Sequence, residues 1–130
     1  MSQQPVELIL LRQLAASLAM PVVMFDAEGM LLFVNEGAER LMGRRMEEIG
    51  RVHLTALSAD FDYWDETGAH LTIAERPVAT AFATRRPVHQ NLKVRTPDGA
   101  MRRVANTALP LVGQSGRFFG VLSILWELER

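Results

Sequence analysis

The chain has 130 residues, no cysteine and a formal net charge of −1 at pH 7. This length fits one domain, large enough to bury about two thirds of the surface that its unfolded form exposes. The chain is 48% apolar and 22% charged, as folded globular proteins are. The charge balance argues against nonspecific nucleic-acid binding. The missing cysteines exclude disulfides, thiolate nucleophiles and zinc–thiolate sites, and suit a cytoplasmic location.

Residues 1–18 are expected to form an amphipathic flanking helix. Its inner stripe follows helical spacing and comprises Leu8, Leu11, Leu14, Ala15 and Leu18. Val6, Ile9 and Leu10 lie outside this stripe, so we predict that a homodimer buries them. The alternative is a helix that lies deeper in its own domain. Polar residues interrupt the apolar run, which is also shorter than the ~20 residues of a membrane span, so neither an export signal nor a membrane helix is expected.

The next segment predicts a β-hairpin followed by two short helices. Two β-branched and aromatic-rich runs within residues 22–34 flank the turn sequence Asp26-Ala-Glu-Gly29. Asn35 then fits the N-cap position of a helix over about 36–42. A second helix is expected over about 45–49, and each helix stops at a glycine.

Residues 51–76 carry the weakest local signals. Asp60 and Asp62 have the spacing of the first two calcium ligands of an EF-hand. Asp65 and Leu71 then occupy positions where that motif needs a glycine and a bidentate glutamate, so no metal site is predicted. A turn over Asp65-Glu-Thr-Gly68, covered by the neighbouring aromatic side chains, is expected instead.

The last part of the chain predicts one helix and three strands. Pro77 suits the first position of a helix over about 77–85. A strand over 88–95 alternates inward and outward residues, and a turn leads to the next strand. The run from Phe118 to Trp126 is apolar on both faces, as in a covered central strand. These elements predict an α+β fold.

Two amides on the last strands are candidates for ligand binding. If the domain senses a ligand, Gln90 and Asn106 should point from adjacent strands into one cavity, and otherwise they are satisfied core amides. Two amides in an apolar wall suit a neutral or weakly polar ring. The remaining predicted wall residues are Phe82, Leu92, Val104 and Leu122.

Three phrases of the chain resemble a PAS domain. "MPVVMFDAEGMLLFVNEGAERLMGR" is similar to its opening hairpin and Asn-capped helix, "IAERPVATAFATRRPV" to its late helix, and "TPDGAMRRVANTALPLVGQSGRFFGVLSILWE" to its closing hairpins. The resemblance implies a single domain over residues 19–130. It implies a five-stranded antiparallel sheet in the order 2-1-5-4-3, with helices across one face enclosing a pocket. It also implies that the flanking helix serves dimerisation.

Departures from better-known members of this family argue against two kinds of cofactor. Flavin photoreceptors of the family form an adduct with a helix cysteine, which this chain lacks. Haem-binding members carry an axial histidine on the late helix, whereas His53, His70 and His89 fall in loops or at outward strand positions. Haem and a cysteinyl-flavin adduct are therefore not expected, and the purified protein should be colourless. The ending Trp126–Arg130 replaces the family's Asp-Ile-Thr type ending, so the chain either acts alone or is part of a longer protein.

The sequence thus predicts a cytoplasmic sensory module that binds a small molecule in its core, mediates dimeric protein interaction, or does both. A downstream signalling protein is a candidate partner, and no nucleic acid or membrane is expected. No constellation for catalysis is present. The alternatives are a ligand-free assembly scaffold and a small α+β isomerase or hydrolase that uses Asp62 or Asp65 with a histidine.

Overall fold

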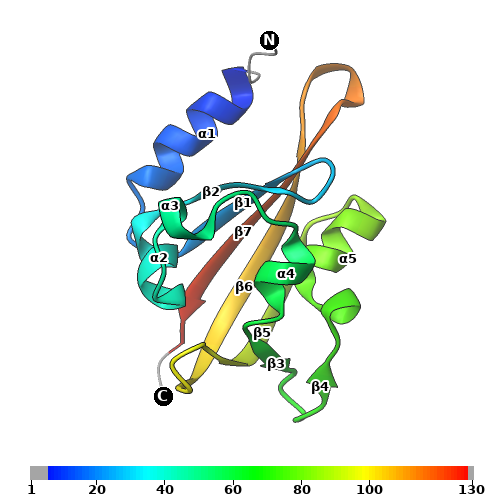
Figure 1. Cartoon of the computed structure of the whole chain (residues 1–130). Coiled ribbons are helices and arrows are strands. Elements are labelled where there is room, and N and C mark those ends of the chain that lie inside the picture. Colours follow the sequence, from blue (N-terminus) through cyan, green and yellow to red (C-terminus); the bar gives the residue numbers. More distant parts are fainter. Residues whose placement is uncertain (1–5, 129–130) are drawn as a thin grey trace.

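An antiparallel sheet forms the frame of the molecule in the computed structural model, which describes residues 6–128 (Figure 1). Its strands are β1 (Val22–Asp26), β2 (Leu31–Val34), β3 (Asp62–Trp64), β4 (His70–Leu71), β5 (Val88–Arg95), β6 (Met101–Val112) and β7 (Phe118–Glu127). They are ordered β2-β1-β7-β6-β5-β3-β4. The predicted five-stranded order is confirmed by β2-β1-β7-β6-β5. The short strands β3 and β4 extend the edge beyond β5, which the five-strand prediction did not include.

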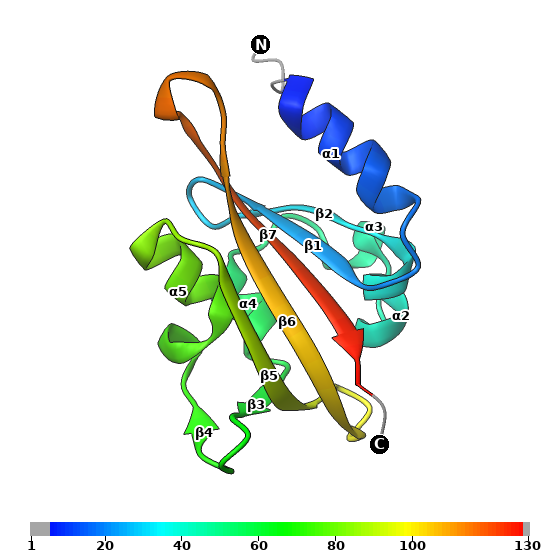
Figure 2. The same ribbon diagram turned by 180° about the vertical axis from the view of Figure 1, so that it is seen from behind.

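Helices lie on both faces of the sheet, as the two opposite views show (Figures 1 and 2). They are α1 (Val6–Ala16), α2 (Glu36–Met42), α3 (Met46–Ile49), α4 (Leu54–Ser58) and α5 (Pro77–Thr84), with 3-10 turns η1 (Ile73–Glu75) and η2 (Gln114–Gly116). Helices α2 to α5 cover one face, and α1 lies against the other. Within residues 6–128, no helix has the length and apolar character needed to cross a membrane.

Local capping signals set the boundaries of α2 and α5 as predicted. The Oδ1 atom of Asn35 accepts a hydrogen bond from the Ala38 N–H at 2.9 Å, which caps the first turn of α2. Gly43 ends this helix in the left-handed conformation, with φ of 69°. Pro77 occupies the first turn of α5, where its missing N–H costs no helical bond.

Helix α1 buries one stripe against the sheet. Leu8 and Ala15 are buried with Val22 and Met24 of β1. The prediction that Leu14 belongs to the buried stripe is wrong, because Leu14 is 59% exposed. At about 100° of rotation per residue, Leu14 lies one step around the helix from Ala15, beyond the edge of the contact with the sheet.

The segment with the weakest signals forms α4 and the β3–β4 hairpin. The predicted turn over Asp65–Gly68 is present and is organised by the Asp65 carboxylate. Its Oδ1 atom accepts hydrogen bonds from the backbone N–H groups of Thr67 and Ala69 at 2.9 and 3.0 Å. Helix α4 was not predicted. Its five residues offer too short a pattern to reveal a helical period.

Candidate ligand cavity

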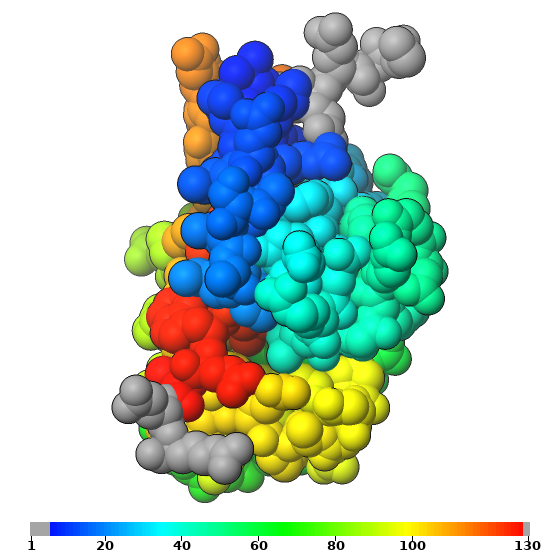
Figure 3. Space-filling model, turned by 90° about the vertical axis from the view of Figure 1, so that its left-hand side faces the viewer, coloured from blue at the N-terminus to red at the C-terminus, as the bar shows by residue number. Residues whose placement is uncertain are grey.

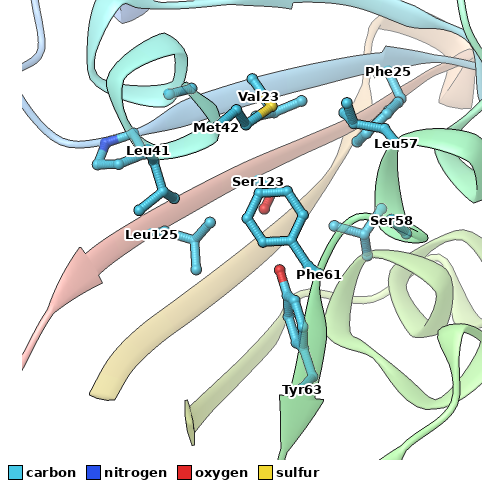
Figure 4. Close-up of a pocket in the computed structure, with 13 residues that line it drawn as sticks. Val23, Phe25, Leu41, Met42, Leu57, Ser58, Phe61, Tyr63, Ser123 and Leu125 are labelled. Carbon is cyan, nitrogen blue, oxygen red and sulfur yellow. The ribbon is translucent and has the colours of Figure 1, made fainter. Parts of the chain in front are cut away.

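A cavity of about 60 Å³ lies between the sheet and the helices that cover it (Figure 4). The elements β1, α2, α4, β3, α5 and β7 all contribute to its wall. The lining residues are Pro21, Val23, Phe25, Ala38, Leu41, Met42, Leu57, Ser58, Phe61, Tyr63, Val78, Ser123 and Leu125. Ten of these thirteen are aliphatic, proline or phenylalanine residues, and none is charged. The wall therefore favours an apolar occupant.

Three hydroxyl groups interrupt this apolar wall, those of Ser58, Tyr63 and Ser123. Ser58 ends α4, Tyr63 lies on β3, and Ser123 lies in the middle of β7. Figure 4 shows the Tyr63 hydroxyl pointing from β3 toward the group of side chains around Ser123 and Leu125. Polar atoms thus enter the cavity from two different sides.

Ser123 is held by Asn106 of the neighbouring strand β6. The Nδ2 atom of Asn106 donates to the Ser123 Oγ at 3.0 Å and to the Ile124 carbonyl oxygen at 3.0 Å. Asn106 and Ser123 are 1% and 5% exposed. The buried amide nitrogen is therefore satisfied, as buried polar groups usually are, and it fixes the serine hydroxyl at the cavity wall.

Tyr63 is backed by a buried arginine. The Arg76 guanidinium lies 4.6 Å from the centre of the Tyr63 ring, within the range of a cation–π contact. Arg76 also donates to the carbonyl oxygens of Ser58 at 2.7 Å and Phe61 at 3.1 Å. Burial raises the pKa of Tyr63 above its ordinary value, and the Arg76 charge opposes this shift. The phenol is consequently neutral at pH 7.

One side chain links the cavity wall to α1. The Nδ2 atom of Asn35 donates to the carbonyl oxygens of Ala15 (2.9 Å), Leu18 (3.1 Å) and Met20 (2.8 Å). Its Oδ1 atom accepts from the N–H of Val22 at 2.9 Å in addition to that of Ala38. Asn35 thereby joins the end of α1, the start of β1 and the start of α2, which supplies three lining residues.

Close packing strengthens the same junction. Gly37 of α2 is buried against the segment that leads from α1 to β1. A Cβ atom at this position would lie 2.5 Å from the Ala19 carbonyl oxygen. Real Cβ atoms do not approach backbone this closely, so only glycine lets α2 and the connecting segment touch.

The predicted amides lie side by side but do not line the cavity. Gln90 and Asn106 are paired across β5 and β6 on the face that α2 to α5 cover. Asn106 borders the cavity only through Ser123, and Gln90 is half-buried. Their role toward a ligand stays a prediction.

The other predicted wall residues are distributed over both faces. Leu92 and Val104 are buried in the core that surrounds the cavity. Phe82 packs edge-to-face on Phe118, with ring centres 5.8 Å apart. Leu122 lies on the opposite face, in the cluster with Leu8 of α1, so its predicted placement in the cavity wall needs correction.

Two features of the sequence point to the actual wall. Ser123 is the only polar residue between Phe118 and Trp126, and a lone hydroxyl in a buried strand marks a place where a polar partner is needed. Tyr63 gave no comparable signal, because its inward direction depends on pairing between β3 and β5.

The carboxylates considered for catalysis lie outside the cavity. Asp62 Oδ1 is 3.4 Å from His70 Nε2, and both side chains are about half exposed, at 49% and 53%. The Asp65 carboxylate is engaged in its own turn. Neither group faces an enclosed space in which a substrate could be held away from water.

The sheet order, the helices over a small apolar cavity and the flanking helix together define a small α+β domain. The chain belongs to the PAS-fold family, whose sequence model matches residues 15–130. It is thus a domain of a family of sensory and signalling modules. No curated protein matches the chain.

Solved structures confirm the fold. The PAS domain of BvgS from Bordetella pertussis is 17% identical, with a TM-score of 0.64, and the match covers 95% of this chain and 87% of that one. The PAS domain of nitrogen regulation protein NR(II) from Vibrio parahaemolyticus is 15% identical, with a TM-score of 0.62 and coverages of 92% and 98%. The PAS domain of the fruit-fly ELK potassium channel is 10% identical, with a TM-score of 0.72 and coverages of 95% and 98%.

Proposed function

We propose that this PAS domain is a cytoplasmic sensory module that binds a small molecule in the cavity and transmits its presence through α1 to a homodimer. The observation that carries the proposal is the position of α2. This helix supplies Ala38, Leu41 and Met42 to the cavity wall, and its N-cap Asn35 binds the end of α1. A change at the cavity can therefore reach α1 through directly bonded groups.

The outer side of α1 supports the dimeric part of the proposal. Its large apolar residues are exposed, namely Val6 at 65%, Ile9 at 42%, Leu10 at 58% and Leu14 at 59%. Figure 3 shows α1 in blue on the surface, beside α2 in cyan, with its outer side uncovered. A second copy of the chain would remove this apolar surface from water, which is favourable by about 25 cal/mol per Å².

A ligand-free assembly scaffold is the second candidate, and the same exposed face of α1 supports it. The two candidates differ in the cavity, because a scaffold has no need of hydroxyl groups on an apolar wall. Structures with a similar fold, such as a PAS domain from a two-component sensor histidine kinase, favour a signalling role.

The test begins with protein purified from its host cells. Native mass spectrometry, followed by denaturation and small-molecule mass spectrometry, should reveal a bound compound. If none is bound, a metabolite screen should find a compound that raises the melting temperature of the protein. An absorption spectrum of the same sample should show neither a haem nor a flavin band. A protein that carries no compound and responds to none would favour the scaffold.

A further inference from the structure

We propose that the cavity selects a small uncharged molecule with a hydrogen-bond acceptor oxygen, such as a ketone, ester or ether, and binds that oxygen through the hydroxyl groups of Ser123 and Tyr63. This inference rests on the proposed function, because it requires that the cavity holds a ligand. It adds the chemical class of that ligand.

The Ser123 hydroxyl has an unused donor at the cavity wall. One of its two lone pairs already accepts from the Asn106 amide at 3.0 Å, and within residues 6–128 its O–H donates to no partner. The side chain is 95% buried at the cavity wall. A buried hydroxyl with an unused donor gains most from an acceptor atom in the ligand.

Tyr63 also favours an acceptor atom in the ligand, for a different reason. Its hydroxyl points into the group of lining side chains (Figure 4), and it makes no hydrogen bond with any other described residue. The Arg76 guanidinium on the Tyr63 ring draws electron density from the phenol, which strengthens O–H as a donor and weakens its oxygen as an acceptor. Two walls of the cavity therefore present donors.

The size and charge of the cavity restrict the ligand further. The cavity volume is about 60 Å³, so only a small molecule, or a small part of a larger one, can enter. No charged side chain lines the cavity, so an ion would lose its hydration without a compensating partner. The Arg76 guanidinium lies behind Tyr63 and already donates to two carbonyl oxygens.

The experiment uses small rings of matched size as probes and Met42 as a reporter. Met42 lines the cavity, whereas Met24 lies on the other face of the sheet and Met101 on an exposed hairpin. The full chain is labelled with ¹³C-methyl methionine and titrated with tetrahydrofuran, which has an acceptor oxygen, with cyclopentane, which has none, and with cationic pyrrolidine. Butyrate serves as an anion of similar size.

Tetrahydrofuran and cyclopentane should shift the Met42 methyl signal alone, and pyrrolidine and butyrate should not. Ser123→Ala and Tyr63→Phe should each weaken tetrahydrofuran binding about two- to tenfold, as loss of one neutral hydrogen bond does. Cyclopentane binding should stay within twofold. Thr107→Val is the matched control, because it removes a hydroxyl from the opposite face of β6 and should change neither affinity.

Three results would overturn the inference. If the two variants lose equal affinity for both rings, or lose none for either, the hydroxyl groups do not bind the acceptor oxygen. Ligand binding itself would then still stand. Tighter binding of butyrate than of tetrahydrofuran would show that the Arg76 charge makes the site prefer anions. If no probe shifts Met42, the cavity holds only water, and the proposed ligand function fails together with this inference.

Discussion

Asn35 connects more of the molecule than any other described side chain. Its amide nitrogen has two protons for three carbonyl oxygens, and its amide oxygen accepts from two backbone N–H groups. The residue is 2% exposed, so water cannot replace its buried bonds to Ala15, Val22 and Ala38 when one is lost. A capping residue at the surface would contribute about 1 kcal/mol, and this one bonds five backbone groups, three of them buried.

We predict that Asn35→Asp separates the two halves of this network. Aspartate keeps both acceptor interactions but has no donor for the carbonyl oxygens of Ala15, Leu18 and Met20. The loss of this donor, together with a buried charge, should lower the free energy of unfolding at pH 7 by about 2 kcal/mol or more. Urea unfolding measures the change.

The control for this substitution is Glu36→Ala at the next residue. Its carboxylate is exposed and, among the described residues, pairs only with Arg40 one turn later, so the change should stay within about 0.5 kcal/mol. If Asn35→Asp unfolds at the same urea concentration as the wild type, the bonds to the end of α1 contribute nothing to stability.

At the scale of elements, the sequence predicted the turns and helix ends that depend on neighbouring residues. The opening hairpin, the start of α2 at Asn35 and its end at Gly43, and the start of α5 at Pro77 all depend on residues within a few positions of each other. Each signal is a turn, a cap or a fixed φ angle. These elements appear in the structure where the sequence places them.

Elements and sites that depend on distant partners were missed. Strands β3 and β4 have three and two residues, and β3 exists because β5 binds it from about thirty residues away along the chain. The run of β7 is apolar at both odd and even positions apart from Ser123. The pattern therefore could not show on which face of the sheet Leu122 lies. The cavity wall likewise gathers from six elements, none of which reveals its partners alone.

Two hairpin turns are held by carboxylates, and both should make stability depend on pH. Hydrogen bonds from the Thr67 hydroxyl and the Ala69 N–H lower the pKa of Asp65. Those from the Thr96 hydroxyl and the Ala100 N–H do the same for Asp98. A lowered folded pKa means stabilisation above the unfolded value of about 3.8 that disappears as pH falls through the folded value.

We therefore expect Asp98→Asn to lose less stability than the wild type when the pH drops from 5 to below 3. The asparagine keeps an acceptor oxygen but does not titrate. Urea midpoints at several pH values test this. Glu66→Gln is the control, because this exposed carboxylate makes no hydrogen bond with the described residues. Parallel pH profiles for Asp98→Asn and the wild type would contradict the expectation.

The outer face of α1 yields a prediction about assembly. Replacing Leu10 and Leu14 with glutamate should weaken the homodimer at least tenfold, because a buried leucine contributes about 1.5–3 kcal/mol and tenfold corresponds to 1.4 kcal/mol. Sedimentation velocity at micromolar concentration gives the result. Substitution is preferable to removing residues 1–18, since truncation also removes carbonyl groups that Asn35 binds.

The control for that variant adds the same charge elsewhere. Ala27→Glu with Ala74→Glu places two carboxylates at exposed positions far from α1 in the sequence, and this variant should sediment as the wild type does. A wild-type protein that is monomeric at micromolar concentration would remove the dimer from the proposal.

For the whole molecule, the cavity and α1 should respond together only through α2. Met42→Ala and Leu57→Ala both enlarge the cavity, from α2 and α4 respectively. Only α2 is joined to α1 by Asn35. Hydrogen exchange followed by mass spectrometry should show faster exchange of the α1 amides in Met42→Ala than in Leu57→Ala at equal global stability. Equal exchange in both variants would mean that cavity and helix are independent.

The carbonyl groups that Asn35 holds are also the ones α1 would need in order to grow. Continued α-helix beyond Ala16 would direct the Ala15 carbonyl to the N–H of Ala19, but Leu18 and Asn35 occupy it. Released from Asn35, residues 17–20, which form a turn and bends, could continue the helix until Pro21 stops it. A side-chain amide thus sets where α1 ends, and with it the length of the surface that α1 presents to a partner.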